Sequence, residues 1–351
     1  MNRCLLSTVA SVYVRYTMTS TSKKPASLKG RIALVAGATR GAGRGIAVAL
    51  GEAGATVYCT GRSTKRHGAT PGRPETIEET AELVKAAGGL GIPIRVDHTD
   101  PAQVRKLVAT IKKRHKGLDI LVNDIWGGDP LTEFGKPFYK CNLKNGLLML
   151  KQALHSHIIT AHYAAPLMLG RRQAIIFEIT DGDAFYYRGN IFYDLVKTSV
   201  IRLAFGMSRE LRKRKIVSVA LTPGFLRSEA VLDYYKTTEA NWKEVGKRVN
   251  PRQNSNDQND APQDFMQSES PRYVGRAVAA LASDPKAMEK TGRVFSSWGL
   301  AREYKFTDTD GTRPDWGRYA TKRYGKYKIC DAQFYSYWAP GLIDLVFPDW
   351  Y

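Results

Sequence analysis

Cysteine is scarce in this sequence, and its four cysteines lie far apart. They stand at positions 4, 59, 141 and 330, and no two of them form a C-x-x-C pair. A disulfide framework or a structural zinc site needs cysteines in closer, repeated pairs. The spacing argues against both and fits a reducing compartment.

The sequence also lacks a long apolar run. The best candidate, between Leu147 and Leu169, is interrupted by Lys151, His155 and His157. A membrane-spanning helix needs about 20 mostly apolar residues in succession. We therefore expect no transmembrane segment. The histidines at positions 155, 157 and 162 have no carboxylate or cysteine at metal-ligand spacing, so no metal site is expected there.

Acidic residues are outnumbered, at 33 Asp and Glu against 53 Lys and Arg, which leaves a net charge of +20. Such a charge favours anionic ligands or surfaces. Five of the Lys and Arg residues lie in a basic and aromatic arm over residues 317–351. We expect this arm to pack on its own domain or on a partner subunit of a homo-oligomer. No recognised nucleic-acid motif accompanies it, so no nucleic-acid partner is expected.

The first 28 residues contain no acidic residue at all but have four Lys or Arg and many Ser and Thr. This composition is typical of a mitochondrial transit peptide and predicts a mitochondrial location. A dispensable tail, or a secretory signal over residues 4–14, is the alternative, and without import the protein would be cytoplasmic. Removing the segment should leave a folded protein.

A run of glycines organises the rest of the chain. The apolar stretch Ile32–Ala36 breaks into Gly37, Gly41 and Gly43 and restarts as an Ala-rich helix. Glycines at such a turn let a pyrophosphate approach the backbone, and the free amides of the first helical turn face the anion. The run therefore predicts a dinucleotide site.

Apolar segments of strand length alternate with helical segments after this run. The expected strands cover residues 32–36, 55–60, 92–96, 118–122, 174–180, 216–221 and 292–297, and the expected helices cover 43–53, 76–87, 101–115, 146–169, 192–212 and 270–282. This alternation predicts an α/β fold, a doubly wound (Rossmann) parallel sheet of about seven strands with helices on both faces. We expect one domain over residues 29–316, with a mobile polar insertion over residues 250–267.

The segment after the second expected strand is informative. Arg62 stands where an acidic residue would bind a ribose 2′-hydroxyl, and Arg40 lies in the glycine loop. Basic side chains here supply the counter-charge for a 2′-phosphate. We therefore expect NADP(H) as the cofactor.

Tyr193 and Lys197 lie one helical turn apart, downstream of the glycine loop. The Lys ammonium is expected to stabilise the phenolate and lower the pKa of Tyr193, so that the tyrosine exchanges a proton with a carbonyl or alcohol oxygen. The two side chains form a candidate acid/base pair.

These features, in this order, resemble the short-chain dehydrogenase/reductase superfamily and its dehydrogenase/reductase subgroup over about residues 28–316. The positions that match its cofactor site are Gly37, Thr39, Arg40, Gly41, Ala42, Gly43, Asp97, Asn123, Pro223, Gly224 and Ser228. Tyr193 and Lys197 match its catalytic pair, which also contacts the cofactor. The resemblance implies hydride transfer between NADP(H) and a small carbonyl or alcohol substrate.

Two positions depart from the superfamily pattern. The usual catalytic Ser is replaced within Ile179-Thr180-Asp181. Spacing from Tyr193 favours Thr180 in the Ser place, whereas the apolar pattern of the strand favours Asp181, and both stay candidates. An ionised Asp only accepts hydrogen bonds. Ala153 stands where the superfamily often has Asn in the long helix.

Two other functions compete with a carbonyl reductase or alcohol dehydrogenase. One is a non-catalytic NADP(H) sensor or scaffold on the same fold. The other is an RNA-associated protein that uses its basic tail. The retained Tyr193 and Lys197 favour the enzyme.

Overall fold

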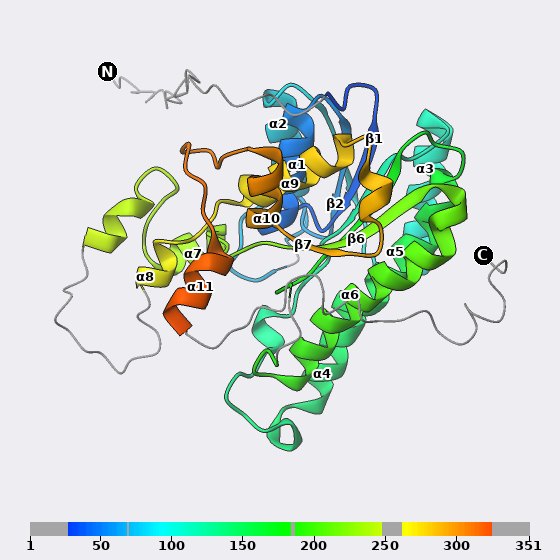
Figure 1. Ribbon diagram of the computed structural model, residues 1–351. Helices are drawn as coiled ribbons and strands as arrows, with labels where there is room; N and C mark the ends of the chain where they lie inside the picture. The colour runs from blue at the N-terminus through cyan, green and yellow to red at the C-terminus, as the bar shows by residue number, and fades with distance from the viewer. Residues whose placement is uncertain (1–26, 69, 184–186, 248–261, 325–351) are drawn as a thin grey trace, which may run out of the picture.

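The computed structural model describes residues 27–68, 70–183, 187–247 and 262–324. Seven parallel strands form one sheet in the order β3-β2-β1-β4-β5-β6-β7 (Figure 1). The strands are β1 Ile32–Ala36, β2 Thr56–Gly61, β3 Leu90–Arg95, β4 Ile120–Asn123, β5 Ala174–Ile179, β6 Ile216–Thr222 and β7 Val294–Ser296. The doubly wound seven-stranded fold is thereby confirmed.

Helices cover both faces of the sheet. The α-helices of the described residues are α1 Gly41–Glu52, α2 Ile77–Ala86, α3 Pro101–His115, α4 Leu143–Leu150, α5 Ser156–Ala164, α6 Ile191–Leu211, α7 Glu229–Tyr234, α8 Pro262–Phe265, α9 Pro271–Ser283, α10 Ser297–Tyr304 and α11 Trp316–Tyr324. Because both faces are covered, the central strands β1, β5 and β6 are buried at every position, and their sequences are mostly apolar.

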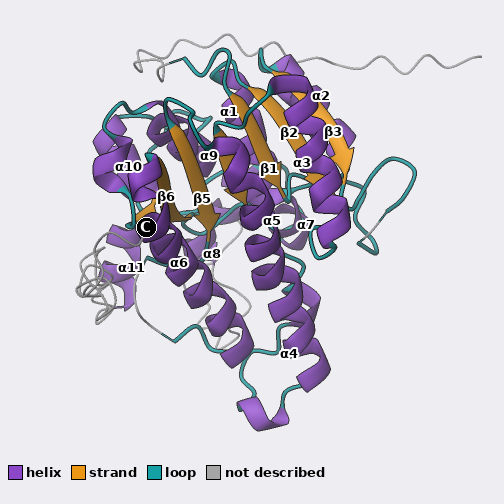
Figure 2. Ribbon diagram, turned by 90° about the vertical axis from the view of Figure 1, so that its right-hand side faces the viewer, coloured by secondary structure: helices purple, strands orange, loops and turns teal. Residues whose placement is uncertain are grey.

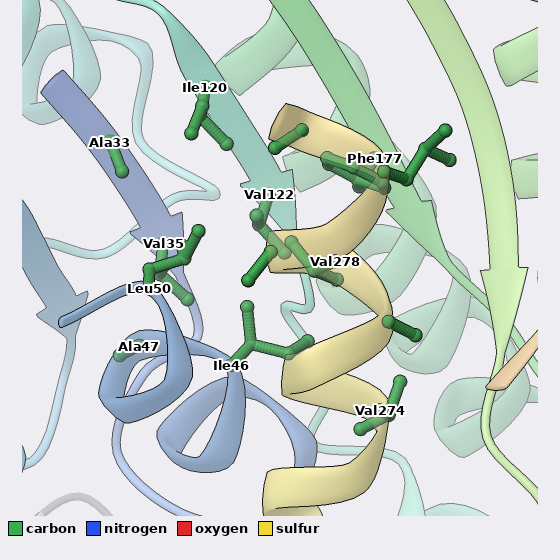
Figure 3. Close-up of a cluster of buried hydrophobic side chains, with 14 of the residues drawn as sticks. Ala33, Val35, Ile46, Ala47, Leu50, Ile120, Val122, Phe177, Val274 and Val278 are labelled. Atoms are coloured by element: carbon green, nitrogen blue, oxygen red, sulfur yellow. The ribbon is translucent and has the colours of Figure 1, made fainter. Parts of the chain in front are cut away.

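Two apolar layers hold the sheet. On one face, α1 and α9 pack their Ile46, Leu50, Val274 and Val278 side chains against alternate residues of β1, β4 and β5, as Figure 3 shows. On the other face, α3 and α5 cover the intervening residues, among them Leu121. The alternation follows from the two-residue period of a strand.

The long helix expected over residues 146–169 begins earlier and is not regular. Asn142 caps α4, and its side chain accepts a hydrogen bond from the Asn145 amide at 3.2 Å. A π-helical turn, Lys151–His155, then joins α4 to α5. Such turns change the face that a helix presents and are frequent at functional sites.

The expected polar insertion over residues 250–267 is wrong at its end. Phe265 of α8 is fully buried and packs on Trp242, because its ring fills a small apolar cluster. Residues 248–261 lie outside the described part of the chain.

The first part of the expected C-terminal arm packs on its own domain. The Tyr319 hydroxyl of α11 donates to the Asp264 carboxylate of α8 at 2.7 Å, and Ala320 is buried. Residues 325–351 lie outside the described residues, as do residues 1–26, so the transit peptide stays a prediction. In the parts of the chain that the structure describes, no helix is long and apolar enough to cross a membrane.

Candidate active site

The glycine loop lies where the strand order reverses. β1 pairs with β2 on one side and with β4 on the other. The strands from β1 to β3 therefore follow one another in one direction along the sheet, and the strands from β4 to β7 follow in the opposite direction. Ligands of doubly wound sheets bind in the crevice at this edge. The candidate site is therefore built from the residues that follow β1, β2, β4, β5 and β6.

Gly37 and Gly43 leave no room for a side chain. Gly37 has a φ of +95°, and a Cβ there would lie 2.2 Å from the Asp124 carbonyl oxygen. A Cβ at Gly43 would lie 2.2 Å from the Gly37 carbonyl oxygen. This close packing brings the first turn of α1 against the loop after β4 and fits the cradle that a dinucleotide requires.

One carboxylate already contacts this cradle. The Glu229 side chain, at the start of α7, accepts a hydrogen bond from the Gly41 amide at 2.7 Å and lies 3.7 Å from the Arg44 guanidinium. An anion is stabilised at a helix N-terminus, so the contact identifies the amides that a cofactor phosphate would use. A phosphate bound there would replace Glu229.

The two arginines expected near a 2′-phosphate differ in their partners. Arg40 donates to Thr70 at 2.6 Å and lies 3.5 Å from the Glu75 carboxylate. Arg62, directly after β2, forms no salt bridge within the described residues. Its charge acts on Asp97. Burial raises the pKa of Asp97, but the hydrogen bonds from Thr99 and the charge of Arg62 outweigh burial, so this pKa lies below its usual value. Arg40 therefore has a carboxylate partner in Glu75, whereas Arg62 has none among the described residues.

Asn123 does not turn toward the glycine loop. Its side-chain amide donates to Glu178 at 2.7 Å, and Glu178 lies 2.6 Å from His157. The other ring nitrogen of His157 lies 3.1 Å from the Ile125 carbonyl oxygen. This buried network ties β4, β5 and α5 together below the site. His157 is thus a paired core residue, and no group of metal-ligating side chains occurs in the portion described.

Asp124 faces Lys197 from the loop after β4. Burial raises the pKa of Asp124 to about 7, against the opposing charges of Lys197 and His157 and the hydrogen bond from the Gly43 amide. Burial lowers the pKa of Lys197, and the carboxylates of Asp181, Asp124 and Asp129 oppose that shift. The Lys197 ammonium lies 4.2 Å above the Trp126 ring. The cation is therefore held between an aromatic face and carboxylates.

The structure brings Tyr193 and Asp181 together. Asn190 caps α6, where its side chain accepts from the Tyr193 amide, and this fixes the first helical turn. The Tyr193 hydroxyl then donates to the Asp181 carboxylate at 2.8 Å. Of the two candidates for the Ser place, Asp181 is the one whose side chain contacts the Tyr193 hydroxyl.

Thr180 faces the other way. Its hydroxyl donates to the Lys197 carbonyl oxygen at 2.8 Å and is buried at the end of β5. Residue spacing favours Thr180 in the Ser place, but its side chain, directly after the last residue of β5, turns to the backbone of α6. Thr180 links β5 to α6 and does not contact the Tyr193 hydroxyl.

The expectation that the pKa of Tyr193 is lowered is wrong. Burial, the Asp181 charge and the hydrogen bond to Asp181 raise this pKa above its usual value. The Lys197 ammonium is 5.5 Å from the centre of the tyrosine ring and packs closer to Trp126. The phenol therefore keeps its proton at neutral pH.

Aromatic rings enclose Tyr193. Trp126 and Phe134 contact its ring edge to face, with ring centres 5.4 and 5.7 Å away. Both come from the segment between β4 and α4. The tyrosine ring is thus held on two sides, while its hydroxyl points to Asp181.

Arg188 orders the loop that carries Asp181. Its guanidinium donates to the Asp181 carbonyl oxygen at 2.6 Å and to the Asp194 carboxylate at 2.9 Å. The Arg188 residue is 8% exposed, so the pairing is largely shielded from water. Sequence reasoning missed this residue, although a basic residue six positions before an acidic one in α6 was visible.

The segment after β6 is held by Glu269. The Gly224 amide and the Ser297 hydroxyl donate to one Glu269 oxygen at 3.0 and 2.6 Å. Ser228, at the other end of the segment, has its Cβ near Gly41. Pro223, Gly224 and Ser228 therefore span from the end of β6 to the glycine loop. No sequence signal marked Glu269, because it comes from a distant part of the chain.

The remaining matched positions support the loop from below. Thr39 and Ala42 are both 8% exposed, and the Thr39 carbonyl oxygen accepts from the Arg44 guanidinium at 3.0 Å. They shape the turn between β1 and α1. Ala153 is buried in the π-helical turn and offers no polar side chain there.

Comparison with known proteins agrees with this geometry. The family model described as short chain dehydrogenase matches residues 31–239. Dehydrogenase/reductase SDR family member 1 of Mus musculus is 31% identical over 82% of this chain and 85% of the relative, and the Homo sapiens protein of that name is 30% identical over the same shares.

Solved structures share the fold. A short chain dehydrogenase from Mycobacterium thermoresistibile has a TM-score of 0.65 at 23% identity and covers 83% of this chain and 93% of its own. L-sorbose reductase from Gluconobacter frateurii, solved with NADPH and L-sorbose, has a TM-score of 0.60 at 19% identity over 77% of this chain and 95% of its own. The chain belongs to the short chain dehydrogenase family, whose members use nicotinamide cofactors, and it is an oxidoreductase.

Proposed function

We propose that this oxidoreductase uses NADP(H) to interconvert a carbonyl and an alcohol, with Tyr193 as the general acid/base. The observation that carries the proposal is the protonated Tyr193 hydroxyl, directed at Asp181 and one helical turn from Lys197. A protonated phenol can donate its hydrogen to a carbonyl oxygen, and the raised pKa opposes this transfer, because a general acid works best with a pKa near the operating pH.

The cofactor preference rests on charge. The cradle of Gly37 and Gly43 would hold the pyrophosphate. Arg62 would bind a 2′-phosphate, because its guanidinium forms no salt bridge with a carboxylate among the described residues. An arginine pairs strongly with phosphate oxygens. Bound NADPH would supply the hydride.

The chain's own residues then handle the proton. The Tyr193 hydroxyl has one hydrogen to donate, and both the Asp181 carboxylate and a substrate oxygen can accept it. The substrate oxygen must therefore take the place of Asp181 as the acceptor. Loss of the proton leaves a phenolate beside Asp181. The Lys197 ammonium, which interacts with both Asp181 and Asp124, offsets this accumulation of negative charge.

A carbonyl panel tests the function. Ketones, aldehydes and steroid-like carbonyls are incubated with the protein and NADPH or NADH, and oxidation of the cofactor is followed by its absorbance. We expect oxidation that requires a carbonyl and is faster with NADPH. Tight NADPH binding without turnover of any compound would favour the alternative, a non-catalytic sensor or scaffold.

A further inference from the structure

The segment between β4 and α4 projects from the body of the protein. Figures 1 and 2 both show α4 and the turn before it extending beyond the carboxyl edge of the sheet. Every residue from Phe134 to Lys140 is exposed. The outermost part of the described chain is therefore accessible on several sides.

Large apolar side chains gather on this projection. The exposed fractions are 66% for Phe138, 72% for Tyr139, 63% for Leu143 and 54% for Leu147. Leu143 and Leu147 are four residues apart and share one face of α4. Exposed apolar groups that cluster in this way mark an interaction surface. We call Phe138, Tyr139, Lys140, Leu143, Lys144 and Leu147 the tip surface.

Positive charge predominates around the tip surface. Lysines stand at positions 136, 140, 144 and 151, and no Asp or Glu occurs from Phe134 to Phe177. Lys136 pairs with Glu133 at 2.6 Å. Among the residues the structure describes, no carboxylate pairs with Lys140, Lys144 or Lys151. The unpaired lysines favour an anionic partner.

A second copy of the chain does not fit this charge. In a two-fold interface both copies bury the same patch, so the unpaired lysines of the two tip surfaces would share one interface in which the nearest carboxylate along the chain, Glu133, already pairs with Lys136. A nucleic acid fits the lysines and the rings, but it offers nothing apolar to the exposed leucines. An anionic bilayer offers both a negative headgroup layer and acyl chains.

We propose that the tip surface docks the protein on an anionic membrane surface. Phe138, Tyr139, Leu143 and Leu147 enter the boundary between headgroups and acyl chains, and Lys140 and Lys144 contact the acidic headgroups. Lysine stems and aromatic rings are suited to this boundary because each joins an apolar body to a polar end. The docking is peripheral and reversible.

Vesicle flotation tests the proposal with the full chain. Vesicles of phosphatidylcholine alone are compared with vesicles that also contain phosphatidylserine, at low and high salt. We expect binding only to the mixed vesicles, weakened by salt. The double substitutions Phe138→Ser with Tyr139→Ser, and Lys140→Glu with Lys144→Glu, should each weaken binding about tenfold or more.

Lys112→Glu with Lys113→Glu is the matched control, since these exposed lysines of α3 give the same change in net charge away from the tip surface. This control should bind nearly as the wild type does. Equal loss in the control and the Lys140/Lys144 variant would overturn the proposal, because net charge alone would then explain binding. So would absence of vesicle binding, tip-dependent dimerisation in its place, or tip-dependent binding to a single-stranded RNA oligomer instead of vesicles.

Discussion

The Tyr193 hydroxyl donates to the Asp181 carboxylate at 2.8 Å, so the proposed proton donor of this site is paired with an acceptor-only group. Burial and this pairing raise the pKa of Tyr193, and removal of the carboxylate charge should lower it in part. Thr180 instead donates to the Lys197 carbonyl oxygen, so Asp181 and Thr180 have separate roles that variants can distinguish.

Asp181→Asn should therefore shift the pH profile of kcat/KM for alcohol oxidation. Alcohol oxidation needs the deprotonated phenol, and without the Asp181 charge the Tyr193 pKa falls, so the alkaline rise of kcat/KM should shift to lower pH. Thr180→Ala removes a hydrogen bond to the α6 backbone and should lower thermal stability by about 1 kcal/mol without shifting the profile. A shift in Thr180→Ala and none in Asp181→Asn would contradict this assignment.

Arg62 should set the preference for NADPH. Arg62→Ala should weaken NADPH binding roughly 10- to 100-fold, the cost of losing a charged hydrogen-bond partner, and leave NADH binding nearly unchanged. Arg40→Ala should have a smaller effect, because Glu75 and Thr70 already engage Arg40. Calorimetry with both cofactors checks this, and equal affinity of the wild type for NADH and NADPH would refute it.

Glu229→Gln should tighten cofactor binding. The Glu229 carboxylate contacts the Gly41 amide that a phosphate would use, and removal of its charge should improve affinity about two- to fivefold. Glu82→Gln, on the exposed face of α2, is the control for net charge. Weaker binding in Glu229→Gln would mean that Glu229 orders the loop and does not compete with the phosphate.

His98 should make stability depend on pH. It lies buried between the Thr60 and Thr160 hydroxyls at 2.9 Å each, and burial lowers its pKa to about 3. The unfolded chain takes up a proton near pH 6.5, whereas the folded chain does so only near pH 3. The free energy of unfolding should therefore fall as pH drops below about 6.5.

Thermal melts between pH 7 and pH 5 measure this effect. His98→Gln should be less stable at pH 7 but should lose less stability on acidification than the wild type. His155→Gln alters an exposed histidine and should leave the pH dependence as it is. An unchanged pH dependence in His98→Gln would exclude His98 as the source.

The fold could be predicted from the sequence because both faces of its strands are buried. Runs such as Ile216–Thr222 are apolar at every position but one or two, and they alternate with amphipathic helices. The end of the polar insertion was harder. Phe265 packs on Trp242 from more than 20 positions further along the chain, and a contact over that separation leaves no local pattern.

The site could be predicted only in part, for a similar reason. Gly37, Gly43, Tyr193 and Lys197 act through local spacing, which the sequence displays. The direction of Asp181 depends instead on where β5 ends against α6. Glu178, Glu229 and Glu269 reach the site from other elements, so only the folded chain brings their carboxylates to it.

The central claim is that the Tyr193 hydroxyl supplies the proton for carbonyl reduction. Tyr193→Phe keeps the ring and its contacts with Trp126 and Phe134 but removes that proton. With a substrate found in the carbonyl panel, kcat should fall by about 10²- to 10⁴-fold, while NADPH binding measured by calorimetry stays near the wild-type value. Turnover of the same substrate by Tyr193→Phe at the wild-type rate would contradict the account.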